Sequence, residues 1–205
     1  KLLVLGTRLK QVGQFSVTWL LAFTNLTVRT AYGLIMTFFP SFLQVTYGLS
    51  TAELALPISI VAVGTTCGLF LGGKIGRSPH RLSLVAITIL IATLPGLAVF
   101  VVNDQLWLTV TVTSVFMVLV MPLATLLFVV GTEIGGTARG TLTGILSGSG
   151  YVSYAVGAGI GGLAVAHIGY SALSFALVAS TIGSSLLLTY LVKTKAEDRA
   201  REYFQ

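Results

Sequence analysis

The stretch "LWLTVTVTSVFMVLVMPLATLLFVV", residues 106–130, contains no charged side chain. About 20 helical residues are enough to cross the hydrocarbon core of a bilayer, so this stretch predicts one transmembrane helix. Stretches of the same kind lie outward from it in both directions: 82–102, 53–75 and 15–43 before it, and 141–167 and 170–192 after it. The fold class expected is therefore an all-α membrane protein with six transmembrane helices.

The composition agrees with a membrane protein. The chain has 205 residues, of which 55% are hydrophobic and 9% are charged, and its mean hydropathy is +0.95. A soluble domain of average composition carries about 25% charged residues, so that class is excluded. Continuous apolar stretches without strict alternation favour helices over the strands of a barrel. We expect one bundle over residues 15–192, a cytoplasmic basic linker segment over 1–14 and a cytoplasmic charged tail over 193–205.

The positive charges lie on one side of the expected membrane. Apart from Arg29, every Lys and Arg lies at or beyond the ends of the spans on that side: Lys1, Arg8, Lys10, Lys74, Arg77, Arg81, Arg139, Lys193, Lys195, Arg199 and Arg201. The positive-inside rule then places both termini in the cytoplasm. This topology explains the net charge of +6, so the expected partner is the lipid bilayer and not a nucleic acid. We expect a multi-pass protein of a bacterial-type plasma (inner) membrane.

The second connection carries a motif, "GGKIGRSPHR", residues 72–81. It resembles G-x3-D-R-x-G-R-R, the cytoplasmic signature between helices two and three of each six-helix half of the major facilitator superfamily (MFS). Gly72, Arg77 and Arg81 match the signature, whereas Gly76 replaces its aspartate. The resemblance implies one half of an MFS transporter, and the missing aspartate favours the C-terminal half. The alternative is that these cations serve only as a topology label.

The same resemblance implies a cytoplasmic gate. Glu133 ends the fourth span and Arg139 opens the fifth, on the same side as Arg77. We expect Glu133 to pair with Arg77 and Arg139, in a gate that also includes Gly72 and Arg81. Exposed ion pairs contribute about 0–1 kcal/mol each, which suits a contact that opens on every transport cycle.

Small residues dominate the fifth span and repeat there every four positions. This small-xxx-small pattern lets helix backbones approach closely in lipid. The stretch also resembles the signature G-x8-G-x3-G-P-x2-G-G of MFS drug antiporters, which implies an exporter. The positions expected in helix packing are Gly144, Ser153, Gly157, Gly161 and Gly162. The alternative is a generic glycine-rich membrane helix.

Arg29 lies in the middle of the first span, where an arginine costs about 2.5–3.5 kcal/mol on insertion scales. Four residues of this span share one helical face: Asn25, Arg29, Tyr32 and Met36. We expect this face, together with Met121 of the fourth span, to contact a small-molecule substrate. A guanidinium binds carboxylate or phosphate through paired hydrogen bonds, which favours an anionic substrate. The alternative is a structural Arg29 that bonds to carbonyl groups of a neighbouring helix.

An enzyme is not expected, because the spans show no carboxylate cluster, metal-ligand spacing or phosphate-binding loop. The run Ser147-Gly148-Ser149-Gly150 comes near the G-x-S-G of rhomboid proteases, but no histidine lies where it could activate the serine. No catalytic residue, metal or cofactor is therefore expected.

The expected function is secondary active transport of a small organic solute or drug. The resemblance implies export, with proton coupling as an option, by alternating access with a second six-helix half. That partner is either a missing N-terminal half or a second copy of this chain. Two alternatives stay open: an uptake symporter for an anion or a sugar, and a membrane assembly module that transports nothing.

Overall fold

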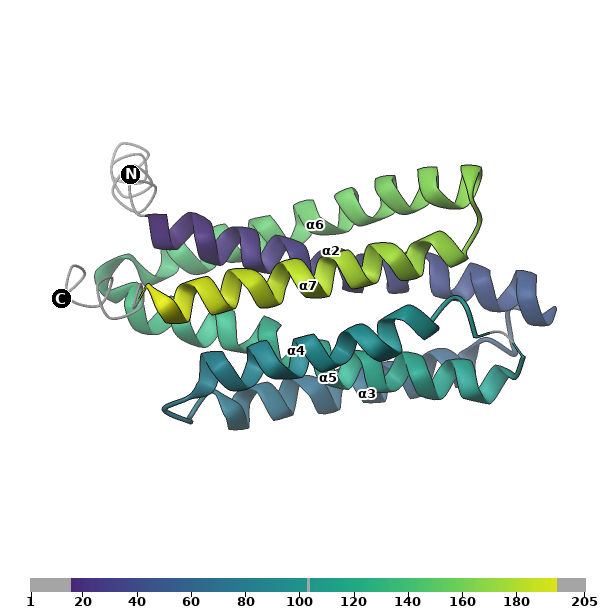
Figure 1. Cartoon of the computed structure of the whole chain (residues 1–205), viewed down its shortest axis with the longest axis horizontal. Helices are drawn as coiled ribbons and strands as arrows, with labels where there is room; N and C mark the ends of the chain where they lie inside the picture. Colours follow the sequence, from purple (N-terminus) through teal and green to yellow (C-terminus); the bar gives the residue numbers. More distant parts are fainter. Residues whose placement is uncertain (1–15, 103, 195–205) are drawn as a thin grey trace.

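Six long helices make up the structure, a computed structural model that describes residues 16–102 and 104–194. They are α2 (Ser16–Tyr47), α3 (Ala55–Ile75), α4 (Arg81–Ala98), α5 (Leu106–Ile134), α6 (Arg139–His167) and α7 (Ser171–Lys193). A short 3-10 turn, η1 (Gly136–Ala138), joins α5 to α6. Figure 1 shows an elongated bundle whose helices run along its long axis, with the start of α2 and the end of α7 at the same end.

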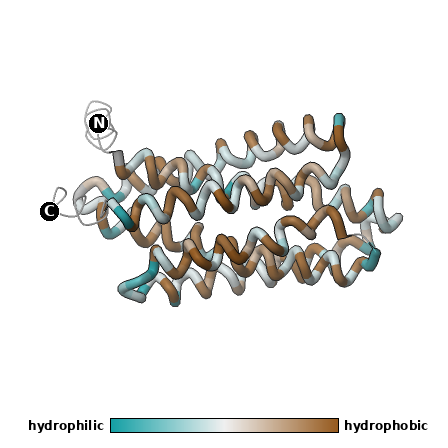
Figure 2. The backbone as a smooth tube through the Cα atoms, in the orientation of Figure 1, coloured by the Kyte–Doolittle hydropathy of each residue, from teal (hydrophilic) through white to brown (hydrophobic). Residues whose placement is uncertain are grey.

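The predicted all-α fold is confirmed for the described residues, which contain no strand. Five helices, α3 to α7, are long and apolar enough to cross a membrane. The 32-residue α2 is not among them, because Asn25, Arg29 and several threonines lower its hydropathy; a sixth span stays a prediction. In Figure 2 hydrophilic residues gather at the two ends of the bundle, and the length between them is mostly hydrophobic.

Helix ends differ from the predicted span ends. The helix α2 continues further than predicted, to Tyr47, and Gly48 then ends it with a φ of 68° that glycine adopts without strain. The helix α5 also runs on, to Ile134, whereas α4 stops early, at Ala98. Apolar runs therefore located the helices, while turn geometry set where they end.

A stripe of glycines lets α3 lie directly against α5. Gly64, Gly68 and Gly72 are buried and follow one another at four-residue intervals. A Cβ at Gly64 would lie 2.9 Å from the carbonyl oxygen of Ser114, and a Cβ at Gly72 would lie 2.7 Å from that of Pro122. Larger residues would force the two backbones apart. Gly72, expected as part of the gate, thus lies in the α3–α5 contact.

A second stripe lets α6 lie against α2. Ser153 is fully buried, and a Cβ at Gly157 would lie 3.0 Å from the carbonyl oxygen of Thr30. At Gly161 a Cβ would collide with the ring of Phe38. These three small residues of α6 therefore set its distance from α2.

Two of the glycines expected in helix packing do not share this contact. A Cβ at Gly144 or at Gly162 would meet nothing within 4 Å among the described residues. Nine residues separate Gly144 from Ser153, so at 3.6 residues per turn the two lie on opposite faces of α6. Within this bundle Gly144 and Gly162 therefore face away from α2, and their part in helix packing stays a prediction for a contact outside it.

Hydroxyl groups tie α7 to its neighbours. The Oγ1 of Thr27 and the Oγ of Ser184 lie 2.8 Å apart, and the Oγ of Ser180 donates to the carbonyl of Thr27. Toward α4, the Oγ of Ser185 donates to the carbonyl of Ala86 at 3.1 Å. Such bonds between membrane helices contribute about 0.6 kcal/mol each on average. They hold α7 against α2 and α4.

Candidate functional site

Arg29 is half-buried on α2, and its partners are neutral. Its Nε donates to the Oδ1 of Asn25 at 3.3 Å, and its Nη1 donates to the hydroxyl of Tyr154 on α6 at 3.4 Å. The guanidinium carbon lies 5.8 Å from the centroid of the Phe128 ring on α5, a cation–π contact. Within the described residues, Arg29 makes no ion pair and its other N–H groups have no acceptor.

Asn25 is a buried residue that orients the side chain of Arg29. It is fully buried, and its Nδ2 donates to the carbonyl of Leu146 at 2.6 Å and to the Oγ of Ser149 at 2.9 Å, both on α6. These two bonds fix the amide so that its Oδ1 faces Arg29, one helical turn further along α2. Asn25 was expected to contact substrate; the structure instead places it in the α2–α6 contact, where it orients Arg29.

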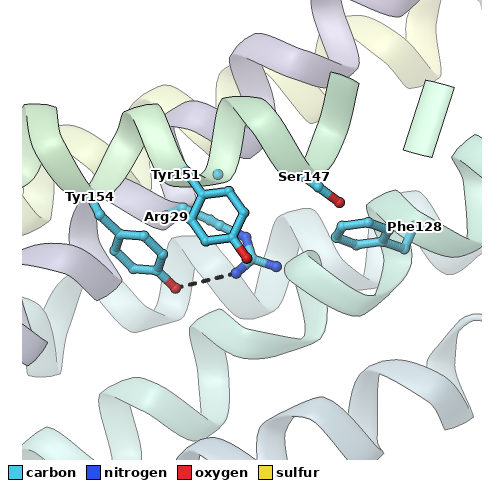
Figure 3. Close-up of a pocket in the computed structure, with 6 residues that line it drawn as sticks. Arg29, Phe128, Ser147, Tyr151 and Tyr154 are labelled. Carbon is cyan, nitrogen blue, oxygen red and sulfur yellow. Dashed lines mark hydrogen bonds between the residues drawn. The ribbon is translucent and has the colours of Figure 1, made fainter. Parts of the chain in front are cut away.

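A cavity of about 160 Å³ opens beside the guanidinium. Its lining consists of Arg29, Phe128, Ser147, Gly150, Tyr151 and Tyr154. Figure 3 shows the guanidinium between Tyr154 and Phe128, with Tyr151 and Ser147 projecting from α6. Every polar side chain of this lining has a hydrogen to donate, and none is a carboxylate. The cavity therefore suits an anionic group with apolar or aromatic surface beside it.

The remaining residues of the expected substrate face lie outside this lining. The ring of Tyr32 packs against Tyr154, with centroids 5.5 Å apart. Met36 is 37% exposed further along α2. Met121 is buried against α3, where a Cβ at Gly68 would lie 2.8 Å from its Cβ. An unbranched methionine fills such gaps between helices well, and this one is not part of the cavity lining.

Sequence reasoning missed five residues of the cavity: Phe128, Ser147, Gly150, Tyr151 and Tyr154. The last four lie on α6 at positions i, i+3, i+4 and i+7, which is the spacing of one helical face. That pattern was present in the sequence. What it lacked was any sign that this face of α6 meets the face of α2 that carries Arg29.

A second arginine, Arg81, lies at the basic end, meaning the end of the bundle that carries Arg77, Arg81 and Arg139. Its Nη1 and Nη2 donate to the two carboxylate oxygens of Glu133 at 2.9 and 2.6 Å, and its Nη1 also donates to the carbonyl of Gly76 at 3.2 Å. This bidentate ion pair joins the start of α4 to the end of α5.

The expected partners of Glu133 are thereby corrected. Arg77 and Arg139 were expected to pair with it, but both are exposed and the ion pair of the described residues is made by Arg81. Arg81 is the first residue of α4, which packs against α5, whereas Arg77 lies in the turn beyond the end of α3.

Among the described residues, no group of His, Cys, Asp and Glu could hold a metal ion.

Fold and site together define a helical bundle of membrane type with an open, donor-lined cavity beside Arg29. No protein-family profile and no curated protein sequence matches the chain. Its fold is similar to two crystal structures of a bacterial homolog to the human lysosomal transporter Spinster, both inward-facing.

The two matches cover almost all of this chain. The unoccupied Spinster homolog gives a TM-score of 0.57 at 19% identity over 97% of this chain and 50% of that chain. The occupied one gives 0.53 at 18% identity over 94% of this chain and 50% of that chain. This chain therefore spans half the length of those structures. The expected six-helix fold is confirmed by this likeness.

Proposed function

We propose that this chain is one half of an MFS transporter that moves a small organic solute across a membrane. Transport proceeds by alternating access, in which two six-helix bundles rock about a site near the midplane. The observation that carries the proposal is Arg29: an arginine halfway along its bundle, beside a cavity, with neutral partners only among the described residues. The half-length match to a transporter fold supports it.

A structural role for Arg29 agrees less well with its contacts. An arginine that only stabilised the bundle would donate its N–H groups to backbone carbonyls or to a carboxylate. Instead it bonds to one amide oxygen and one phenol, both at more than 3.2 Å. A charge held this loosely gains most from an anion that enters the cavity, so we propose an anionic solute.

The second bundle is the proposed partner, either an N-terminal half or a second copy of this chain. Support comes from α6, where Gly140, Gly144 and Gly148 form a stripe at four-residue spacing. A Cβ at any of them would meet nothing within 4 Å among the described residues. Open stripes of this kind allow close contact with another membrane helix. The outward face of α6 is thus the proposed contact with the second bundle.

We propose export from a bacterial-type inner membrane as the direction, on the glycine-rich pattern of α6. The carboxylates of the described residues, Glu53, Asp104 and Glu133, lie at the ends of the helices, away from Arg29. Proton-coupled transporters use an intramembrane carboxylate or histidine. A proton carrier, if coupling uses one, therefore belongs to the second bundle in this proposal.

Flux through proteoliposomes tests the proposal. The complete protein, with its second bundle, is reconstituted and offered labelled organic acids, sugars and organic cations. We expect an organic acid to be transported, and Arg29→Ala to lower its flux at least about tenfold, the loss of one charge-assisted interaction. Arg29→Lys, which keeps the charge without the fork, serves as the matched control, and the unfolding midpoint of each variant reports folding. Undiminished flux in Arg29→Ala, or no flux of any solute in the wild type, contradicts the proposal.

A further inference from the structure

Gly150 lies where the side chain of Arg29 passes over α6. The glycine is buried and lines the cavity. A Cβ built on it would lie 2.9 Å from the Cδ of Arg29, 3.2 Å from the Nε of the same side chain and 3.6 Å from the Nδ2 of Asn25. The arginine therefore occupies the space that any other residue at position 150 would need.

This contact differs from those of the other glycines on α6. A Cβ at Gly157 would meet the backbone of α2, as expected for helix packing, and a Cβ at Gly148 would meet nothing within 4 Å. At Gly150 the nearest atoms belong to the functional side chain itself. A glycine in a helix costs about 1 kcal/mol relative to alanine, so a buried one halfway along a helix calls for a specific reason.

Arg29 has little freedom to avoid a methyl group at this position. Asn25 is held by two hydrogen bonds to α6, and the Nε of Arg29 is bonded to its Oδ1. A methyl group on residue 150 would push the middle of the arginine side chain away from α6. The guanidinium would then leave Asn25 and Tyr154 and change its direction in the cavity.

We propose that Gly150 is a specificity-determining residue: it lets Arg29 lie across α6 so that the open edge of the guanidinium faces a carboxylate or phosphate group of an organic solute. This inference rests on the proposed function, and names the residue on which anion selectivity depends. The aromatic lining from Phe128, Tyr151 and Tyr154 takes the apolar part of the solute.

Binding of four related probes tests this role. Benzoate, phenyl phosphate, benzyl alcohol and benzylamine share a ring and differ in the charged group. They are titrated against the complete protein in lipid nanodiscs, with saturation-transfer NMR and calorimetry as readouts. We expect benzoate or phenyl phosphate to bind best, and which one it is separates a carboxylate site from a phosphate site. Gly150→Ala should weaken that anion about tenfold, as for one lost charge-assisted bond, and leave benzyl alcohol unchanged.

The matched control is Gly183→Ala, in the middle of α7, where an added Cβ would meet its nearest atom at 3.9 Å, an ordinary contact; its affinities should stay within about twofold of the wild type, as expected where the added methyl group fits. In an Arg29→Ala background, Gly150→Ala should cause no further loss, because the colliding side chain is gone. Unchanged anion binding by Gly150→Ala, or an equal loss in both backgrounds, overturns the proposal.

Folding is monitored through the unfolding midpoint. If Gly150→Ala alone fails to fold, the double variant Arg29→Ala/Gly150→Ala should fold as Arg29→Ala does, and its failure to do so overturns the proposal. If the wild type transports a solute, Arg29→Ala abolishes this flux and Gly150→Ala preserves it, only the role proposed for Gly150 is overturned. An absence of flux in the wild type overturns the proposed function instead.

Discussion

Arg29 and Arg81 both reach from one helix to the next, yet their surroundings differ in one decisive respect. Arg81 meets both oxygens of Glu133 at 2.9 and 2.6 Å, at the basic end of the bundle. Arg29 meets an amide and a phenol at 3.3 and 3.4 Å, beside a cavity halfway along it. The paired arginine joins two helices, whereas the one with neutral partners keeps, in our proposal, its charge available for a ligand.

The difference between the two arginines is removed most directly by placing a carboxylate next to Arg29. Ser147 is exposed and shares the cavity with Arg29, so Ser147→Glu places an acid within reach of the guanidinium. The new carboxylate competes with an anionic solute, and we expect benzoate or phenyl phosphate affinity to fall about tenfold to 100-fold. Titration of the complete protein in nanodiscs measures it.

The control for this change is Ser147→Gln, which has the same shape without the charge. It should bind the anion to within a few-fold of the wild type. Equal losses in the two variants would show that the added bulk, and not the added charge, blocks the cavity.

A glycine of the α3–α5 contact provides a second test. Gly72 precedes the loop that leads to Arg81, and a Cβ there would lie 2.7 Å from the carbonyl oxygen of Pro122. Because backbone cannot yield as a side chain can, Gly72→Ala should lower the free energy of unfolding by about 1–3 kcal/mol. Unfolding of the complete protein in detergent measures the change.

The neighbouring Gly73 is the matched control, because a Cβ there would meet nothing within 4 Å. Gly73→Ala should be neutral or stabilise the helix by up to about 1 kcal/mol. If Gly72→Ala keeps its stability but loses transport, Gly72 would instead act in the gate that the loop signature predicts.

The pair at the basic end has a smaller effect on stability. The side chains of Arg81 and Glu133 are 11% and 38% exposed, so Glu133→Gln should cost about 1 kcal/mol or less, and less still at high salt. The charge exchange Arg81→Glu/Glu133→Arg should recover what either single change loses in transport. Arg77→Ala should leave stability unchanged; an effect as large as that of Arg81→Ala would restore the partner first expected for Glu133.

The smallest effect concerns the phenol of Tyr154. Its hydroxyl accepts from Arg29 at 3.4 Å, which is long for a hydrogen bond. Tyr154→Phe keeps the ring that packs on Tyr32 and should weaken anion binding only about twofold to threefold. Tyr151→Phe, on the same face of α6, is the comparison variant. A tenfold loss in Tyr154→Phe would mean that the phenol itself contacts the solute.

Local patterns predicted much of this molecule. Long apolar runs located all six helices of the described residues, because helix formation in a membrane protein depends on properties within each segment. The cost of a charge inside a span drew attention to Arg29 in the same way. The helical face through Asn25, Arg29 and Tyr32 also follows from spacing along one helix, and the structure places all three toward α6.

Contacts between helices were predicted less well. The loop signature favoured Arg77 as the partner of Glu133, but the packing of α4 on α5 gives that position to Arg81. The stripe of Gly64, Gly68 and Gly72 is visible in the sequence at four-residue spacing, yet only the structure shows that it faces α5. Spacing identifies a face of a helix and does not say which neighbour that face meets.

The sequence by itself determined six helices, an excess of positive charge at one end and a costly arginine inside the first span. Tertiary structure alone decided that α6 supplies Ser147, Gly150, Tyr151 and Tyr154 around that arginine, and that Arg81 closes on Glu133. The physical reason is the range of the interactions. Hydropathy and helical periodicity act within a segment, whereas the partner of a charge depends on which two backbones can approach closely enough.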